Sequence, residues 1–418
     1  MVDCPGITDK RPREGRTPAS PPTRPLEGLR ILDVATILAG PVTATFLADF
    51  GAEVIKVELP GKGDVTREGP GLREGLSFLW LQEGRNKKSI TLDLHKPEGQ
   101  ALLKRLVALA DGMVENFRPG TLEAWGLAPE TLLEVNPRLV LLRISGYGQT
   151  GPYRHKGAFD RTVSAFSGHL YVTGYPDRPP VRSGYALADY LGGYAGAFAM
   201  LSAFYYREMR GGPGQVIDLA LYEPLLRASE ASIPIYHRTG QVRERSGDTN
   251  PYIVPSSSFQ ASDGKWVVLS ANTDRLWARL AQAIGRPELA LDERYATLEA
   301  RCARPEEVYA LLQEWTAGLT AAEIVAQCDA VQLPAAVVNS IADIFDDPHV
   351  QARQNIVLFN DPRLGQVAVP GILPKFSATP GRIDHLGQEL GFSNREIYGG
   401  LLGLDDLDIA SLQERGVI

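Results

Sequence analysis

Short apolar runs and longer amphipathic stretches alternate along the first third of the chain. LRILDVA (29–35) and EVIKVE (53–58) have the composition of strands, and PVTATFLADFGA (41–52) between them begins with a proline, which suits the first turn of a helix. The same order recurs further on, with strands expected at 89–94, 112–117 and 138–145 and a helix at 97–110. Strands separated by helices predict a parallel, doubly wound sheet, and therefore a Rossmann-like α/β fold. The first crossover reads ATILAGP (35–41), so the G-x-G-x-x-G signature of dinucleotide binding is absent.

The pattern changes after residue 223. Residues 240–275 are rich in loops and then strand-like, and 305–330 is helical, which predicts a smaller α+β domain over 235–340. This domain is inserted into a larger one formed by 25–230 and 345–418. The first 24 residues are rich in Pro and Arg and lack the apolar segment of a secretory signal, so we expect 1–24 to be a disordered tail.

Charge and cysteine content limit the classes of function. The chain has 43 Lys and Arg against 50 Asp and Glu, and no basic run is interleaved with aromatic residues, so we expect no nucleic acid partner. Its three cysteines and six histidines show no metal-ligand spacing, which predicts no metal site and a reducing compartment. Residues 190–206 are uncharged but contain four tyrosines and three glycines. We therefore expect a helix buried in a soluble protein, no membrane contact and a cytoplasmic location.

One carboxylate stands at the start of this uncharged stretch, because Asp189 directly precedes residues 190–206. At a helix N-terminus the macrodipole would keep the carboxylate ionised and able to attack an electrophile. Gly192 and Gly193 leave the first turn without side chains, so a substrate carbonyl could approach closely and free N–H groups could face its developing oxyanion. The alternative is that Asp189 only caps a buried helix.

Five stretches of the sequence, in this order, resemble the family III CoA-transferases, which include formyl-CoA transferase, carnitine CoA-transferase and α-methylacyl-CoA racemase. The stretches are PLEGLRILDVATILAGP (25–41), LADFGAEVIKVELPGKGDVTR (47–67), RNKKSITLDL (85–94) with VENFRPGTLEAWGL (114–127), ISGYGQTGPY (144–153) and PVRSGYALADYLGGYAGAFAML (180–201). The resemblance extends from residue 25 almost to the end of the chain.

The resemblance implies that Asp189 is the catalytic nucleophile. In this family the aspartate attacks an acyl-CoA to give a mixed anhydride, the released CoA converts it to an aspartyl-CoA thioester, and the incoming acid leaves as the new acyl-CoA. A CoA thioester is thus the substrate, and no cofactor is held permanently. The family also forms interlocked homodimers, in which each chain threads the ring of the other.

The resemblance also suggests where CoA would bind. Lys87, Lys88 and Arg118 follow or border strands at the expected ligand edge of the sheet, where CoA phosphates need positive charges, although each is alternatively an ordinary surface charge. The family places CoA along the segment 156–160, which begins with Lys156, and along Leu38, Ala39, Leu92, Asn116, Phe117 and Arg118. The active-site glutamine of formyl-CoA transferase falls at Leu38, and an arginine near the adenine falls at Leu59. Both departures weaken the case for oxalate or formate as the substrate.

The family's racemases use a Gly-His-Asp triplet whose histidine moves a proton. The corresponding triplet here is Ala-Phe-Asp, with Phe159 in place of the histidine, and phenylalanine cannot exchange a proton. Asp160 either orients the acyl group as a second active-site carboxylate or caps a helix. A racemase or isomerase, and a non-catalytic CoA-binding protein, are the alternatives to a transferase.

Several segments are most similar in sequence to the succinyl-CoA-dependent members, which act on dicarboxylic acids. These segments are NKKSI, GYGQTGP, PVRSG and VPSSSFQASDGKW. A dicarboxylate of four to six carbons would leave a second carboxylate to be bound, for which Arg182, Arg243 or Arg245 could supply a guanidinium. The family's glycine-rich flap is reduced here to ERSGDTNPY (244–252), with a single glycine.

Overall fold

The computed structural model describes residues 23–69, 71–73 and 75–418. The expected tail, 1–24, lies outside these residues except for its last two. The Arg24 side chain pairs with Glu27 at 3.3 Å and with Asp384 at 2.7 Å. The expected disorder therefore does not extend to Arg24.

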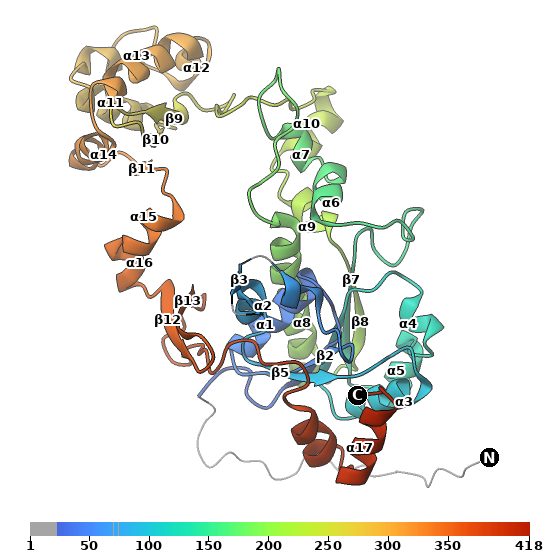
Figure 1. Ribbon diagram of the computed structural model, residues 1–418. Coiled ribbons are helices and arrows are strands. Elements are labelled where there is room, and N and C mark those ends of the chain that lie inside the picture. The colour runs from blue at the N-terminus through green and yellow to red at the C-terminus, as the bar shows by residue number, and fades with distance from the viewer. Residues whose placement is uncertain (1–22, 70, 74) are drawn as a thin grey trace.

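A six-stranded parallel sheet forms the centre of the described chain (Figure 1). Its strands are β1 (Arg30–Asp33), β2 (Glu53–Glu58), β5 (Lys87–Thr91), β6 (Gly112–Glu115), β7 (Val140–Ser145) and β8 (Gln215–Ala220). The order across the sheet is β5-β2-β1-β6-β7-β8, and every neighbouring pair is parallel. Chain order reverses between β1 and β6, which confirms the doubly wound α/β fold and places a ligand crevice beyond the carboxyl ends of these two strands.

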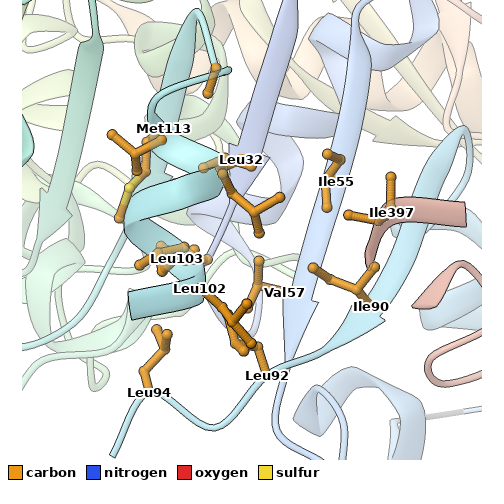
Figure 2. Packing of buried hydrophobic residues seen from close by; sticks show 14 of the residues in the cluster. Leu32, Ile55, Val57, Ile90, Leu92, Leu94, Leu102, Leu103, Met113 and Ile397 are labelled. Atoms are coloured by element: carbon orange, nitrogen blue, oxygen red, sulfur yellow. The ribbon is translucent and has the colours of Figure 1, made fainter. Parts of the chain in front are cut away.

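Helices cover both faces of this sheet because the strands are apolar on both sides. One face carries α3 (Pro97–Val107), α4 (Thr121–Ala124), α5 (Pro129–Val135) and α17 (Asp406–Glu414). The other carries α1 (Ala39–Asp49), α8 (Leu187–Met209) and α9 (Tyr222–Arg227). Figure 2 shows the first core, in which Leu32, Ile55 and Ile90 of the sheet meet Leu103 of α3.

The C-terminal part of the chain returns to complete this first core. Ile397 belongs to a π-helix, Arg395–Leu401, and lies beside Ile90 in Figure 2. Tyr398 is fully buried, and its hydroxyl donates to the Thr91 carbonyl at 2.7 Å. Val417 and the last residue are buried in the same cluster. The last residues are therefore part of the same folded body as the first strands.

Residues 254–337 have a hydrophobic cluster of their own, built around Phe259, Trp277 and Leu312. A three-stranded antiparallel sheet of β9 (Ser256–Gln260), β10 (Trp266–Ser270) and β11 (Ala335–Val337) packs with α11 (Asp274–Ala283), α12 (Leu298–Cys302), α13 (Pro305–Ala317) and α14 (Ala321–Ala330). Figure 1 shows this region well separated from the six-stranded sheet. The domain boundaries given above stay a prediction, which this separate core supports.

The remaining elements are shorter and lie within or between these regions. They are η1 (Val65–Glu68), β3 (Leu72–Arg73), β4 (Leu76–Ser77), α2 (Phe78–Glu83), α6 (Asp160–Phe166), α7 (His169–Val172), α10 (Ser232–Thr239), η2 (Pro287–Ala290), α15 (Ile341–Asp346), α16 (Pro348–Ala352), β12 (Ile356–Asp361) and β13 (Gly365–Pro370). No helix in the described ranges is long and apolar enough to cross a bilayer.

The helix expected from residues 190–206 is buried on one side only. Gly193, Ala197 and Met200 of α8 are buried against the sheet and α1, whereas Phe198 is 73% exposed and Tyr205 57% exposed. A helix that is buried on every side is apolar on every side, and α8 carries apolar residues on both its buried face and its exposed face. Its outer face is therefore an exposed apolar surface, which the sequence pattern alone did not distinguish from core.

Candidate active site

Helix α8 packs closely against its neighbours because glycines lie at the contact. A Cβ added to Gly193 would lie 2.5 Å from Val42 of α1, and one added to Gly192 would lie 2.7 Å from Leu221. The Thr43 hydroxyl also donates to the Gly193 carbonyl at 3.1 Å. The expectation that Gly192 and Gly193 leave room for a substrate is wrong, since both are buried and neighbouring side chains fill the space. Gly193 brings α8 against α1, and Gly192 brings it against Leu221.

Asp189 is the third residue of α8, is partly buried, and accepts no hydrogen bond from a described residue. Burial, and then the negative charge of Asp160, raise the pKa of its carboxyl from 3.8 to about 7. The helix start therefore does not lower the pKa of this carboxyl as expected, because desolvation and a like charge raise it. The other reading, a capping aspartate, also fails, because the N-cap position of α8 is Ala186 and Asp189 makes no capping hydrogen bond.

Asp160 has a defined place beside Asp189. It is the first residue of α6, and its Oδ1 accepts a hydrogen bond from the backbone N–H of Ala188 at 2.7 Å. It thus satisfies an N–H group in the first turn of α8 and does not act as the N-cap of its own helix, which is Phe159. The structure thus supports a capping role, but for α8 and not for its own helix, and the expected role of Asp160 in orienting the acyl group stays a prediction.

Asp189 lines a cavity of about 220 Å³ beyond the carboxyl ends of β1, β6 and β7. The structure brings to this cavity most of the residues that the resemblance assigned to CoA, together with Phe159. The lining residues among them are Leu38, Ala39, Asn116, Phe117, Arg118 and Lys156. Phe159 is 70% exposed, and Gly157 approaches Arg118 so closely that an added Cβ would lie 3.1 Å from its guanidinium.

A second cavity, of about 230 Å³, adjoins the first, with Thr36 and Phe117 lining both. It contains Leu92 and Leu59, and also three residues that the sequence reasoning missed: Lys62, His95 and Trp125. Lys62 and His95 come four residues after the ends of β2 and β5. Their position after parallel strands was the available signal, because ligands bind beyond the carboxyl ends of such strands.

Two lysines expected to contact phosphates lie elsewhere. The Lys87 side chain is 1% exposed, and its ammonium pairs with Asp33 at 2.9 Å and donates to the Pro41 carbonyl at 2.7 Å. Lys88 pairs with Glu53 and Glu396, each at 2.7 Å, and lines neither cavity. Lys87 and Lys88 begin β5, their ammonium groups are already paired with carboxylates, and neither lines either cavity, so the structure does not support the expected contacts with CoA phosphates.

The arginines considered for a second substrate carboxylate do not line the Asp189 cavity. Arg243 pairs with Glu230 at 2.7 Å, and Arg245 donates to the Tyr171 carbonyl at 2.8 Å. The segment 244–252 is held against the end of α7, where the Gly247 N–H donates to the Gly174 carbonyl at 3.0 Å. Arg182 is exposed and donates only to the carbonyl of its neighbour, Ser183, among the described residues.

No group of three or more His, Cys, Asp or Glu side chains within the described ranges is arranged to hold a metal ion. The charged and polar side chains that line the two cavities include Asp189, Asn116, Arg118 and Lys156 in the first and Glu58, Lys62, Asp64 and His95 in the second. Positive side chains near the carboxyl edge of a parallel sheet suit a ligand that carries phosphates, and a carboxylate in a partly desolvated cavity suits covalent catalysis.

A parallel α/β sheet with such a cavity at its carboxyl edge is typical of enzymes that act on nucleotide-containing substrates. Residues 26–391 match the sequence model of the CoA-transferase family III, and the chain belongs to this family of CoA-transferases.

Two curated relatives come from Chloroflexus aurantiacus. A succinyl-CoA–D-citramalate CoA-transferase is 47% identical over 95% of this chain and 99% of the relative, and the beta subunit of a succinyl-CoA–L-malate CoA-transferase is 45% identical over 95% and 98%. A CAIB/BAIF family protein from Brucella suis has a crystal structure that matches with a TM-score of 0.80, 35% identity, and coverage of 90% of this chain and 99% of that one.

Proposed function

We propose that this CoA-transferase moves CoA from succinyl-CoA to a dicarboxylic acid of four to six carbons, with Asp189 as the nucleophile. The observation that carries the proposal is the position of Asp189, whose carboxylate has no described hydrogen-bond donor and lines the same cavity as Asn116, Arg118 and Lys156. A carboxylate held by ion pairs would be a poor nucleophile, whereas a desolvated one is reactive once it is ionised.

The reaction begins when an Asp189 oxygen attacks the thioester carbonyl of succinyl-CoA. The C–S bond breaks, CoA leaves as a thiolate, and a succinyl-aspartyl anhydride remains. The thiolate then attacks the aspartyl carbonyl, which releases succinate and leaves an aspartyl-CoA thioester. The acceptor acid attacks this thioester to form a second anhydride, and the thiolate finally attacks the acceptor's acyl carbon. Asp189 is regenerated as a carboxylate, and the new acyl-CoA leaves.

We assign the two adjoining cavities to the two ends of a CoA thioester. The cavity around Asp189 would hold the thioester end, and the cavity with Lys62 and His95 would hold the nucleotide end. In the second cavity, the ring of Trp125 packs edge-on against His95, with centroids 4.9 Å apart. Arg118 and Lys156 at the first cavity supply cations for the phosphates between the two ends.

The relatives motivate the choice of substrates. Their names specify succinyl-CoA with D-citramalate or L-malate, and others specify glutarate or mesaconate. We extend this dicarboxylate preference to the present chain. The racemase alternative is not favoured by any observation at the site, because Phe159 lines the cavity where a proton-transferring side chain would be needed.

We also propose that the protein is an interlocked homodimer. The exposed apolar face of α8, with Tyr194, Phe198, Leu201 and Tyr205, is of the kind that another chain covers. In Figure 1 the region 254–337 stands apart from the large sheet and is joined to it by two long connections, which leaves an opening that a second chain could thread. Sedimentation at micromolar protein should give twice the mass of 45.5 kDa.

The test of substrate class is a direct transfer assay. Purified protein is incubated with succinyl-CoA and, in separate reactions, D-citramalate, L-malate, mesaconate, glutarate, oxalate or carnitine, and the new acyl-CoA is measured by mass. We expect the highest kcat/KM with one of the four dicarboxylates of four to six carbons. Faster transfer to oxalate or carnitine would contradict the substrate class, and no transfer from succinyl-CoA to any of these acids would contradict the proposed function.

A further inference from the structure

The turn between β1 and α1, residues 35–38, has a strained backbone at the edge of the candidate site. Ile37 has a φ of 68°, in the left-handed region that a β-branched residue rarely adopts. Ile37, Leu38 and Ala39 all line the cavity that contains Asp189. The Ile37 side chain is 39% exposed, so burial of that side chain does not account for the conformation. Strain of this kind persists only where the surroundings enforce it.

Side chains from three other segments bind consecutive backbone groups of this turn. The Lys56 ammonium, from β2, donates to the Ala35 carbonyl. Asn116, after β6, pairs with both backbone groups of Thr36: its Oδ1 accepts from the N–H at 2.8 Å, and its Nδ2 donates to the carbonyl at 2.7 Å. Both carboxylate oxygens of Asp64 lie 3.3 Å from the Ile37 nitrogen and accept its N–H.

The two charged members are themselves fixed. Lys56 pairs with Asp64 at 3.1 Å and lies 3.6 Å from Asp33, and all three side chains are buried. Asp64 also accepts from the N–H and the hydroxyl of Thr66, at 2.9 and 2.8 Å. Burial by itself raises the pKa of Asp64, but Lys56 and Thr66 together hold it below its ordinary value. The carboxylate is therefore kept as an acceptor for the Ile37 N–H.

We propose that Lys56, Asp64 and Asn116 are positioning residues, which hold the turn 35–38 in its strained form so that its backbone and that of Ala39 are placed opposite Asp189 for the reacting thioester. This inference rests on the proposed function for its kinetic consequence only. Its structural content is that the side chains of Lys56, Asp64 and Asn116 hold a strained turn, an arrangement that we call the clamp. The clamp does not depend on which substrate is transferred.

The most direct test is Asp64→Asn, because every group that faces this carboxylate is a donor. Its partners are the Ile37 N–H, the Thr66 N–H, the Thr66 hydroxyl and the Lys56 ammonium. An amide of the same shape must direct its NH₂ group at one of these donors in either orientation. We expect kcat for CoA transfer to fall about tenfold or more, with KM for the acyl-CoA changed less than about threefold.

A second substitution separates positioning from general damage. Ile37→Gly removes the strain, because glycine adopts a positive φ freely, and it removes a side chain that is partly exposed. In the double variant with Asp64→Asn we expect kcat to recover to within about threefold of Ile37→Gly alone. An equal loss of kcat from Asp64→Asn with and without Ile37→Gly would overturn the proposal, and so would a wild-type kcat in Asp64→Asn.

Asp49→Asn is the matched control, because Asp49 is a buried carboxylate at the far end of α1, paired with Arg85 at 2.6 Å. It should lower thermal stability without the loss of kcat. Hydrogen exchange of the peptide covering 34–40, without substrate, is the readout that needs no activity. We expect the exchange to be at least about tenfold faster in Asp64→Asn than in wild type or Asp49→Asn.

The outcomes distinguish the two proposals. If the wild-type protein transfers no CoA but Asp64→Asn speeds exchange at 34–40, the proposed function fails and the clamp is retained. If exchange is unchanged, the clamp is refuted whatever the activity. Should Asp64→Asn fail to fold, Thr66→Val removes only the hydroxyl that orients Asp64 and decides the question by the same two measurements, since an unchanged kcat and unchanged exchange would refute the clamp.

Discussion

The carboxylate of Asp160 accepts a hydrogen bond from the backbone N–H of Ala188 at 2.7 Å, and its charge raises the pKa of the adjacent Asp189 beyond the effect of burial. Asp160, which helps to order the start of α8, thereby also shifts ionisation of the proposed nucleophile to higher pH. Structure and reactivity at this position are coupled through a single carboxylate.

The pH dependence of transfer should follow Asp189, whose pKa is raised to about 7. Attack requires the carboxylate, so kcat/KM should fall tenfold for each pH unit below about 7 and level off above about 8. In Asp160→Asn the amide oxygen still accepts the Ala188 N–H, but the like charge is gone, and the midpoint should move to lower pH. A profile that is flat down to pH 5, or a midpoint unmoved by Asp160→Asn, would contradict this reading.

A second group titrates in the same range and needs its own control. Burial raises the pKa of Glu115 to about 7 although Arg143 is bonded to it at 2.6 Å, and its other oxygen accepts the Phe117 N–H beside the cavity. Glu115→Gln retains an acceptor for that N–H. If the kinetic midpoint belongs to Asp189, Glu115→Gln should leave the midpoint in place.

Close packing of α8 on α1 should make Gly196 intolerant of any side chain. An added Cβ would lie 2.6 Å from Thr43 Oγ1 and 2.9 Å from Leu142. We expect Gly196→Ala to lower the free energy of unfolding by about 1–3 kcal/mol, measured by urea denaturation. Gly400→Ala is the control, because an added Cβ there meets no heavy atom within 4 Å. Equal stability of the two variants would show that the helices can separate to accept a methyl group.

Arg118 and Lys87 should behave in opposite ways when their charge is removed. Arg118 lines the Asp189 cavity, so Arg118→Ala should raise KM for acyl-CoA about tenfold with little change in melting temperature. Lys87 is buried against Asp33, so Lys87→Met leaves a carboxylate in the core and should lower the melting temperature markedly without a specific rise in KM. A rise in KM for acyl-CoA in Lys87→Met, without a lower melting temperature, would indicate that Lys87 contacts CoA.

The sequence predicted the parallel sheet well, because short apolar runs such as EVIKVE alternate with amphipathic stretches and each became the element its period suggests. It did less well on the role of single residues. Gly192 looks like a substrate contact from its place at a helix start, yet it serves packing, and the same position did not indicate that burial raises the pKa of Asp189. Periodicity shows which face of an element is apolar, but not what covers that face.

Long-range contacts explain the remaining differences. Lys87 and Lys88 are adjacent in sequence, but one faces Asp33 in the core and the other faces Glu53 and Glu396. The turn 35–38 shows no unusual residue in the sequence, and its strain is visible only in the backbone angle of Ile37. Asp64 and Asn116, which hold that turn, lie 27 and 80 residues away from the groups that they bind. No local pattern could have indicated these partners.

The measurement that tests the central claim most directly is identification of the residue that becomes acylated during turnover. Protein is incubated with succinyl-CoA, quenched with hydroxylamine or borohydride, digested and analysed by mass spectrometry. We predict one modified peptide, the one containing SGYALADYLGG, with the change at Asp189. Asp189→Ala should lose both the adduct and transfer while CoA binding stays within about tenfold of wild type. An adduct on another residue, or near-normal transfer by Asp189→Ala, would contradict the account.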